Sequence, residues 1–378
     1  MKTVKILSLV IFITVTAIAV KSIVPAFQHH KTVSEMVSLN DDYTKLWAKA
    51  DSLVAKGLTR SAIEVVQIIY TKAKNENNTG NFVKAVTYKL KLESYISDDD
   101  YVKEINDLNQ EISEAKFPVK PVMYSMTAEV YWKYYLTNRY KFLNRTETVN
   151  FVPEDIRTWD LRKIIEQVIK NYQLSLEDAA NLKKTSINVY DAILVKQSAN
   201  SSDYRPTLYD FLAHRAVDFF MNEEPGLVSP ANGFEINDAS YFDPYDKFIN
   251  NKITTEDTYN LKYYATLILQ DLIRFHKDDT NPQVLIDNDL KRLKFVRQKS
   301  VHPDKDTLYM QALENLQKKF VTFPASTEVI YEIANYYYAQ GNNWANSNDD
   351  NDRWKLKKAY AICSEAIDKF PDAFGSGN

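Results

Sequence analysis

Residues 46–69 read LWAKADSLVAKGLTRSAIEVVQII, and the spacing of their apolar side chains decides the fold class. Apolar residues recur three and four positions apart on each side of Gly57. An α-helix turns once in about 3.6 residues, so each run lines one face of a helix. The expected buried positions are Leu46, Ala50, Leu53 and Val54, and then Ala62, Val65, Val66 and Ile69. Because Lys56-Gly57-Leu58 separates the two runs, the stretch predicts a helix hairpin.

The same arrangement recurs towards the other end of the chain. In the tetratricopeptide unit, of about 34 residues, small residues stand where two helices cross and a proline follows the second helix. Ile330, Ile333, Ala334, Tyr337 and Gly341 match the first helix, and Ala359, Cys363, Ala366 and Pro371 match the second. Shorter partial matches to the tetratricopeptide spacing occur at Ala312, Leu316 and Pro324 and at Ala128 and Tyr131. The insertion 342–352, NNWANSNDDND, is expected to lengthen the turn between the last two helices.

Sheet has little support, because period-two alternation is scarce and no paired β-branched runs flank an Asn-Gly or Asp-Gly turn. We therefore predict an all-α protein, an antiparallel array of helical hairpins that forms a tetratricopeptide-like solenoid without substantial sheet. The predicted regions are a signal peptide (1–22), a linker (23–39), an N-terminal helical repeat region (40–200), a turn-rich irregular segment (201–257), a C-terminal tetratricopeptide-like region (258–372) and a tail (373–378).

The first residues carry the pattern of a secretory signal. Lys2 and Lys5 precede the uncharged run Ile6 to Val20, and Ala17 and Ala19 supply small residues at the spacing of a cleavage site. We expect an exported protein of the periplasm or cell envelope, cleaved near Ala19, with a retained anchor as the alternative. No cysteine follows the apolar run, so a bacterial lipobox is excluded.

Composition excludes several classes of site. The 378 residues include only 7 Gly, and no glycine-rich dinucleotide or phosphate loop can be written with them. The formal charge of −3, with the two signs interspersed, offers no basic footprint for nucleic acid. The single cysteine, Cys363, has no disulfide partner in the chain. We expect no cofactor and no nucleic-acid partner.

One helical stretch carries a possible proton-transfer or metal group. Asp210, His214 and Asp218 lie four apart in LYDFLAHRAVDFF, so a helix would stack them on one face. A metal site would need further ligands, and no HExxH or second nearby histidine accompanies them. Pairing along the helix or a buried polar contact is the favoured interpretation.

Two other sequence patterns are similar to functional motifs but favour a purely structural role. Cys363-Ser364-Glu365-Ala366 is similar to the Cys-x-Glu-Gln of internal thioesters, but Ala366 replaces the glutamine and no thioester can form. The Asn/Asp run at 342–352 could hold calcium, yet it lacks the glycine and terminal glutamate of an EF-hand loop, which favours a solvated loop. Glycosylation-like triplets begin at Asn77, Asn144 and Asn200. No catalytic constellation emerges, and we do not expect an enzyme.

Aromatic residues are the candidates for partner binding. They gather in residues 131–140, YWKYYLTNRY, over more than one face of a helix, where core packing competes with stacking on bases or sugars. The residues expected to line a concave partner-binding groove are Tyr131, Tyr134, Tyr135, Tyr336 and Tyr338.

Five ordered blocks carry a family resemblance. They are LWAKADSLVAKGLTRSAIEVVQIIYTKAKNENNTGNFVKAVTYKLKLESY (46–95), MYSMTAEVYWKYYLTNRYKFLNRT (123–146), DIRTWDLRKIIEQVIKNYQLSL (155–176), TLYDFLAHRAVDFF (207–220) and LKRLKFVRQKSVHPDKDTLYMQALENLQKKF (290–320). In this order they resemble the N-terminal helical region of long bacterial alpha-2-macroglobulin family proteins, over about residues 40–375.

The resemblance implies an exported protease-trapping protein, an endopeptidase inhibitor, of which this chain is a non-catalytic helical scaffold. Its macroglobulin, bait and thioester parts are not found in these residues. Implied partners are other proteins or downstream macroglobulin domains of the same polypeptide, with proteases contacted indirectly and the membrane only through the signal segment. The alternative is a stand-alone envelope adaptor of tetratricopeptide type that binds a peptide, protein or glycan. We expect the chain to be a fragment of a longer protein.

Overall fold

The computed structural model describes residues 42–96, 100–143, 152, 155–195, 201–222, 233–347 and 352–377. In these residues every regular element is a helix, and an isolated bridge between Ser186 and Thr207 is the only β-type pairing. The all-α prediction is confirmed. The expected signal peptide and linker lie outside the described residues.

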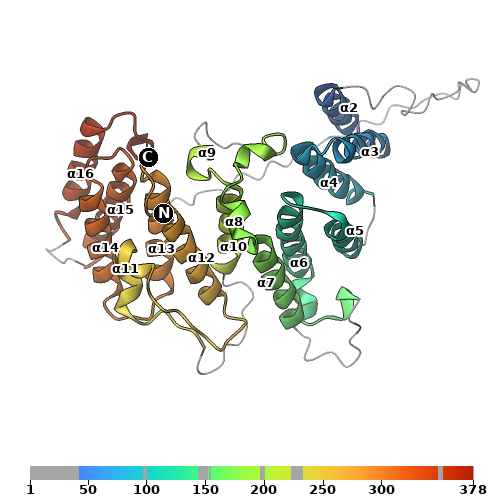
Figure 1. Ribbon diagram of the computed structural model, residues 1–378. Helices are drawn as coiled ribbons and strands as arrows, with labels where there is room; N and C mark the ends of the chain where they lie inside the picture. Colours follow the sequence, from blue (N-terminus) through green and yellow to red (C-terminus); the bar gives the residue numbers. More distant parts are fainter. Residues whose placement is uncertain are drawn as a thin grey trace, which may run out of the picture.

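The first half of the array consists of successive packed helices (Figure 1). They are α2 (Tyr43–Ala55), α3 (Thr59–Asn75), α4 (Thr79–Glu93), α5 (Asp100–Glu114), α6 (Val119–Leu143) and α7 (Leu161–Leu176). α3 packs against both α2 and α4, and α6 packs against both α5 and α7. The short 3-10 helix η1 (Ile156–Thr158) lies between α6 and α7, and α8 (Ala179–Leu182) and the 3-10 helix η2 (Ile187–Tyr190) follow α7.

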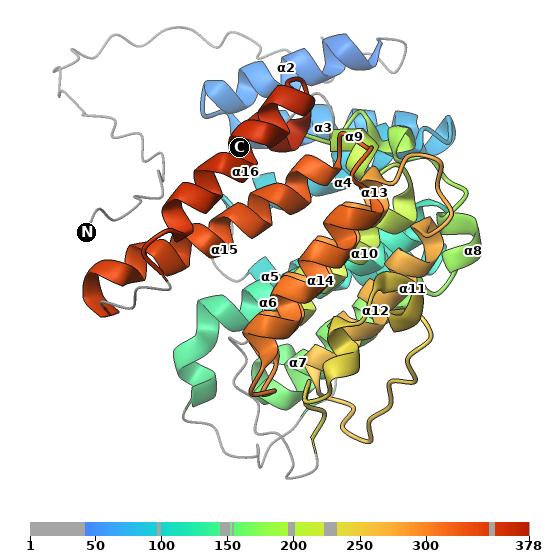
Figure 2. The same ribbon diagram turned by 90° about the vertical axis from the view of Figure 1, so that its left-hand side faces the viewer.

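The second half continues the same row and ends in the hairpin drawn in red (Figures 1 and 2). Its elements are α9 (Ser201–Tyr204), α10 (Leu208–Phe220), η3 (Ala239–Phe242), α11 (Tyr245–Phe248), α12 (Leu261–His276), α13 (Gln283–Lys299), α14 (Lys305–Lys319), α15 (Ser326–Ser347), α16 (Lys355–Lys369) and η4 (Phe374–Gly377). From α12 to α16 each long helix packs against the next. α10 joins the halves, because it contacts α6 and α7 on one side and α12 on the other.

The first hairpin forms as the spacing predicts. α2 ends at Ala55, and Gly57 follows two residues later with a φ of +71°, a left-handed conformation that glycine adopts without steric cost. The amide of Leu58 donates to the carbonyl of Leu53 and completes this turn. Across it, Ala50 and Ala62 are fully buried and let the two helices approach closely.

The predicted bounds of the turn-rich segment, 201–257, are too wide, because residues 208–220 form the helix α10 on which Asp210, His214 and Asp218 were expected to lie. Thr207 starts α10, because its hydroxyl accepts from the Asp210 amide while the Asp210 carboxylate accepts from the Thr207 amide. Ten residues of α10 are buried. The capping box and this apolar burial outweigh the turn-forming residues on both sides.

Residues 233–257 are mostly irregular and are held against α13 by a buried arginine. Arg292 is 1% exposed, and its guanidinium donates to the carbonyls of Tyr241 and Asp243 and to Asp289 Oδ1 at 2.7 Å. The same group lies 4.3 Å from the centre of the Phe248 ring. The arginine therefore supplies hydrogen bonds to two backbone carbonyls of a segment that forms no regular helix or sheet.

The last hairpin differs from its prediction at the insertion. α15 continues to Ser347, so the first half of 342–352 extends the helix and is not a loop as expected. Residues 342–347 contain no proline or glycine to end the helix. Residues 348–351 lie outside the described part. Within the residues that the structure describes, no helix has the length and apolarity to span a membrane.

Candidate functional site

A cleft of about 1210 Å³ opens in the first half of the array. Its walls come from α4, α5, α6 and α10, from Arg157 in η1, and from residues 190–195, which start at the last residue of η2. Its apolar lining includes Val83, Leu90, Val122, Met126, Val130, Tyr134, Tyr190, Ile193, Leu194 and Phe211. The cleft joins residues more than one hundred positions apart in the sequence.

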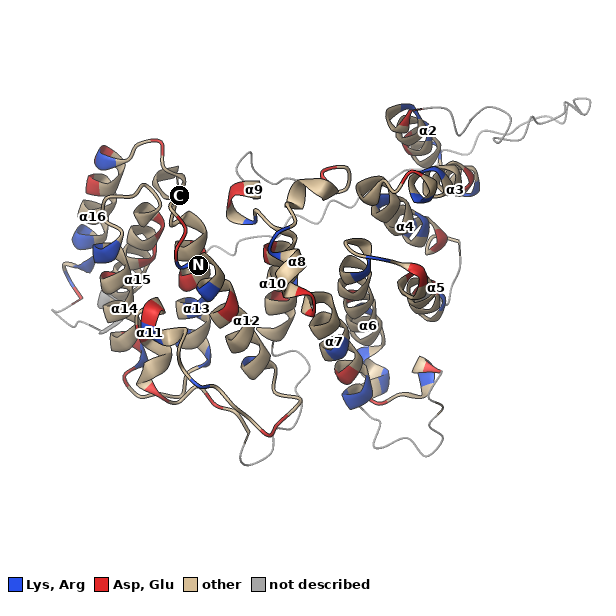
Figure 3. Ribbon diagram, in the orientation of Figure 1, with Lys and Arg blue, Asp and Glu red and all other residues tan. Residues whose placement is uncertain are grey.

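Charged residues around this cleft are mostly basic. Five cations line it, namely Lys91, Lys133, Lys141, Arg157 and Arg215, against the two carboxylates of Glu104 and Glu129. The difference is three positive charges, whereas the whole chain carries −3. Figure 3 shows basic positions on the ribbon of α6 and near the start of α7, among acidic positions elsewhere. The cleft is therefore a local positive region of a net acidic chain.

Arg215 fixes one wall of the cleft. Its Nε donates to the Ser125 hydroxyl at 2.9 Å, and its Nη2 pairs with Glu129, which also accepts from Lys133 at 2.7 Å. Burial of Glu129 would raise its pKa, but the charges and hydrogen bonds of Arg215 and Lys133 outweigh burial and lower it. Glu129 is thus held as a carboxylate between two cations, and this network links α10 to α6.

Lys91 and Lys141 stand at the cleft without such neutralisation. Both side chains are exposed, and Lys141 Nζ donates to the neutral Asn138 amide oxygen at 2.8 Å. Within the described ranges neither ammonium group forms an ion pair with a carboxylate. Among the described residues, their charges therefore have no carboxylate partner.

Three of the five tyrosines expected to line a groove are buried. Tyr131, Tyr134 and Tyr135 are 5%, 6% and 2% exposed, so the expectation of exposure is wrong for all three. Tyr131 stacks on Trp159, and Tyr135 stacks on Trp132. The reason is that α5, α7 and α10 all contact α6 and bury more than one of its faces. Tyr134 nevertheless contributes to the cleft lining.

The other two tyrosines lie on α15, far along the chain from the cleft. Tyr336 is half-buried beside Tyr309 and Arg297. Tyr338 is 57% exposed, as expected. The five tyrosines therefore do not form one surface.

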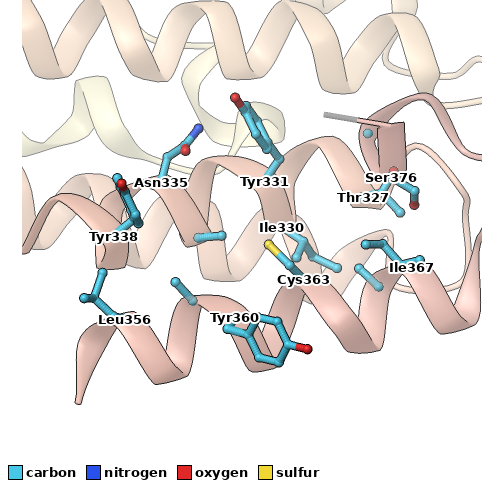
Figure 4. Close-up of a pocket in the computed structure, with 14 residues that line it drawn as sticks. Thr327, Ile330, Tyr331, Asn335, Tyr338, Leu356, Tyr360, Cys363, Ile367 and Ser376 are labelled. Atoms are coloured by element: carbon cyan, nitrogen blue, oxygen red, sulfur yellow. The ribbon is translucent and has the colours of Figure 1, made fainter. Parts of the chain in front are cut away.

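Tyr338 lines a second hollow, a groove of about 550 Å³ between α15, α16 and η4 (Figure 4). Its walls are mainly apolar, and the exposed side chains Leu356, Tyr360 and Ile367 lie along it. Cys363 faces the groove from α16, and burial raises the pKa of its thiol. Cys363 is half-buried and packs against the edge of the core, so it is less buried than the core position that the repeat predicts.

The predicted Asp210, His214 and Asp218 group lies on α10, but its side chains turn to different partners. His214 Nε2 is 2.9 Å from Asn288 Oδ1, and its Nδ1 is 3.1 Å from Lys291 Nζ. Asp218 pairs with Lys291. His214 is bound by α13 and not by the carboxylates of its own helix. Burial, followed by the nearby Arg205 and Lys291 charges, lowers the pKa of His214 well below its ordinary value.

Asp210 binds a different histidine. His276 Nε2 lies 2.8 Å from Asp210 Oδ1, and its Nδ1 lies 2.7 Å from Asp279. Burial opposes the charge on His276, but hydrogen bonds to both carboxylates and their charges outweigh it and raise the pKa. These contacts are the buried polar interactions favoured from the sequence, and they join α10, α12 and α13.

The remaining candidate sites can be placed only in part. In the described residues no group of three or more His, Cys, Asp or Glu is arranged to hold a metal ion. Asn77 lies between α3 and α4 with a φ of 54°. Asn144, Asn200 and residues 348–351 lie outside the described part.

Comparison with protein-family models, with curated proteins and with solved structures finds no match to this chain. The sequence analysis missed the cleft and the basic residues Lys91, Lys141 and Arg215. No local pattern marks them, since they come from three helices that only the tertiary fold brings together.

Proposed function

We propose that this chain is a non-catalytic helical scaffold that holds a segment of a partner protein in the cleft between α4, α5, α6 and α10. The observation that carries the proposal is the cleft itself. Its volume of about 1210 Å³ exceeds the roughly 300–1,000 Å³ of ordinary small-molecule sites. Apolar side chains give such a segment area to bury, and the basic side chains fix its orientation.

The arrangement of the walls supports binding over catalysis. Arg215 and Glu129, which are charged and partly buried at the cleft, are paired with each other and with Lys133. Ion-paired groups of this kind stiffen a surface, whereas general acids and bases need a free proton site near the substrate. Packed helices on each side keep the cleft preformed, which lowers the entropic cost of binding.

The resemblance supports a place for this scaffold in an exported alpha-2-macroglobulin-like protease-trapping protein. In that setting the occupant is a downstream domain of the same polypeptide or another envelope protein. Sequencing the encoding locus past the codon for Asn378 tests this. A reading frame that continues into β-sandwich domains, a bait region and thioester features supports the placement, and an immediate stop contradicts it.

A stand-alone envelope adaptor is the second candidate. Tyr95, 61% exposed beside the cleft, is the observation that favours it, because an exposed aromatic ring can contact a peptide or a sugar. In this case the purified chain binds its partner without further domains.

Selection of peptides from a random displayed library against the purified full chain tests cleft binding. Selected peptides should bind saturably, and Thr87→Trp, which fills the cleft from α4, should weaken them at least tenfold. Asn335→Trp, an equal enlargement in the α15–α16 groove, is the matched control and should leave affinity unchanged. Failure to select any peptide, or equal effects of the two variants, contradicts the proposal.

A further inference from the structure

Building on the proposed function, we propose that the cleft recognises an acidic, extended peptide segment, whose carboxylates meet Lys91 and Lys141 while an apolar side chain enters the lining between them. The segment belongs to a separate partner protein. This assigns a ligand chemistry to the cleft.

The first argument is charge complementarity. Of the five cations that line the cleft, Arg215 and Lys133 share Glu129, and Arg157 pairs with Asp155. Lys91 and Lys141 remain as exposed ammonium groups, on α4 and α6 respectively. A neutral or basic ligand would leave these two positive charges without a counter-charge, whereas the carboxylates of an acidic ligand would form ion pairs with them. Complementary charge also raises the association rate and gives it a dependence on salt.

The second argument is the character of the lining. Tyr101, Tyr134 and Phe211 come from α5, α6 and α10 and present aromatic surface. The Tyr101 hydroxyl and Thr137 Oγ1 form a hydrogen bond at 3.0 Å, which spans α5 and α6 beside these rings. Aromatic and aliphatic walls provide a place for one large apolar side chain. A purely polyanionic ligand would leave this surface uncovered.

The third argument is the fixed position of the basic wall. Arg215 is held by Ser125 and Glu129 together, so its side chain loses little further freedom on binding. The paired network therefore acts as a support, and the exposed lysines make the contacts that depend on the ligand.

Fluorescence anisotropy with three labelled peptides tests the inference on the full chain. One peptide alternates glutamate with leucine and tyrosine, the second replaces each glutamate with glutamine, and the third replaces it with lysine. We expect the acidic peptide to bind at least tenfold more tightly than either of the others. Raising the salt from about 50 to about 500 mM should weaken it several-fold.

Reversing the charge of Lys91 and Lys141 tests whether the acidic peptide binds at the cleft. Lys91→Glu with Lys141→Glu should reduce affinity for the acidic peptide at least tenfold and improve affinity for the lysine peptide. Lys277→Glu with Lys318→Glu, which changes net charge equally at exposed positions outside the cleft, is the control. All four side chains are exposed, and circular dichroism checks that the variants keep their helix content.

The contradicting outcomes are distinct. Equal binding of the glutamate and glutamine peptides overturns the acidic assignment, while peptides obtained by unbiased selection still support the scaffold. Equal loss in both double variants also overturns it, since the effect is then one of net charge. An oligonucleotide or sulfated glycan that binds as tightly as the acidic peptide identifies a general anion surface and overturns the peptide assignment.

Discussion

The cleft and the α15–α16 groove are both hollows between neighbouring helices, yet they offer different chemistry. The cleft has basic side chains over an apolar lining, whereas the groove is lined mainly by apolar side chains from α15 and α16. Elements distant in sequence, from α4 to α10, build the cleft, while one hairpin and the short η4 build the groove. Stacked helices thus create hollows by shape, and the side chains at each hollow determine what it can recognise.

A body of helices with buried polar contacts lies between the two hollows in the chain. Figure 2 shows α10, α12 and α13 grouped together beside α14 and α15. In this body Arg292, Asp210 and His276 are almost completely buried. This body connects the two hollows, since it supplies one wall of the cleft and packs against the helices that precede the groove.

The largest expected effect comes from breaking this body at Arg292. Arg292→Met leaves Asp289 buried without its cation and leaves the carbonyls of Tyr241 and Asp243 without a donor. Removal of one partner of a buried pair typically costs about 3–5 kcal/mol of unfolding free energy. Urea unfolding followed by circular dichroism measures the loss.

Arg297→Met is the matched control on the same helix. Arg297 is partly exposed and pairs with Asp306. Its removal should cost less than about 1 kcal/mol. Similar losses in the two variants would contradict the role assigned to Arg292.

The next effect is a pH-dependent loss in Asp210→Asn. Asparagine keeps an acceptor for His276 but removes the charge that helps to raise the pKa of that histidine. A raised histidine pKa stabilises the fold fully below the unfolded value, near 6.5, and this contribution disappears as pH rises through the folded pKa. The substitution should cost about 1–3 kcal/mol at pH 6 and clearly less at pH 9.

Urea unfolding of the parent chain and of Asp210→Asn at both pH values provides the measurement. Taking the difference between the two proteins at each pH removes the opposite contribution of His214, whose pKa is lowered. A difference that does not change with pH would show that the Asp210 charge is not coupled to His276.

The smallest expected effect is on the labelling rate of Cys363, the only cysteine of the chain, which lines the groove and not the cleft. Because burial raises the pKa of Cys363, a maleimide should label the folded chain several-fold more slowly than the urea-unfolded chain at pH 8. Saturation of the cleft with the acidic peptide should leave this rate unchanged, since the cleft and groove share no lining residue. Protection of Cys363 by that peptide would place its binding site in the groove.

The sequence predicted the first hairpin well because its information is local. Around Gly57, apolar spacing and one left-handed glycine determine which faces of α2 and α3 pack. The middle of the chain could not be predicted in this way. The contacts of Arg292 join residues about fifty positions apart. The capping box of α10 lies next to turn-forming residues, which makes the start of this helix hard to recognise in the sequence.

The candidate site shows the same limit more strongly. The sequence predicts that Tyr134 is exposed, but the side chain is buried. Only a small part of it reaches the lining of the cleft. Lys91 and Lys141 carry no local pattern, because a lysine on a helix is ordinarily a solvated surface residue. Their common position depends on the packing of α4 and α6 around the cleft.

Amide hydrogen exchange of the full chain, with and without a peptide obtained by unbiased selection, tests the central claim most directly. If the cleft is the partner-binding site, added protection should concentrate in residues 83–95, 122–141 and 208–220, and residues 326–347 and 355–369 should exchange at unchanged rates. Protection confined to the α15–α16 hairpin would contradict the account, because the groove and not the cleft would then be the recognition surface.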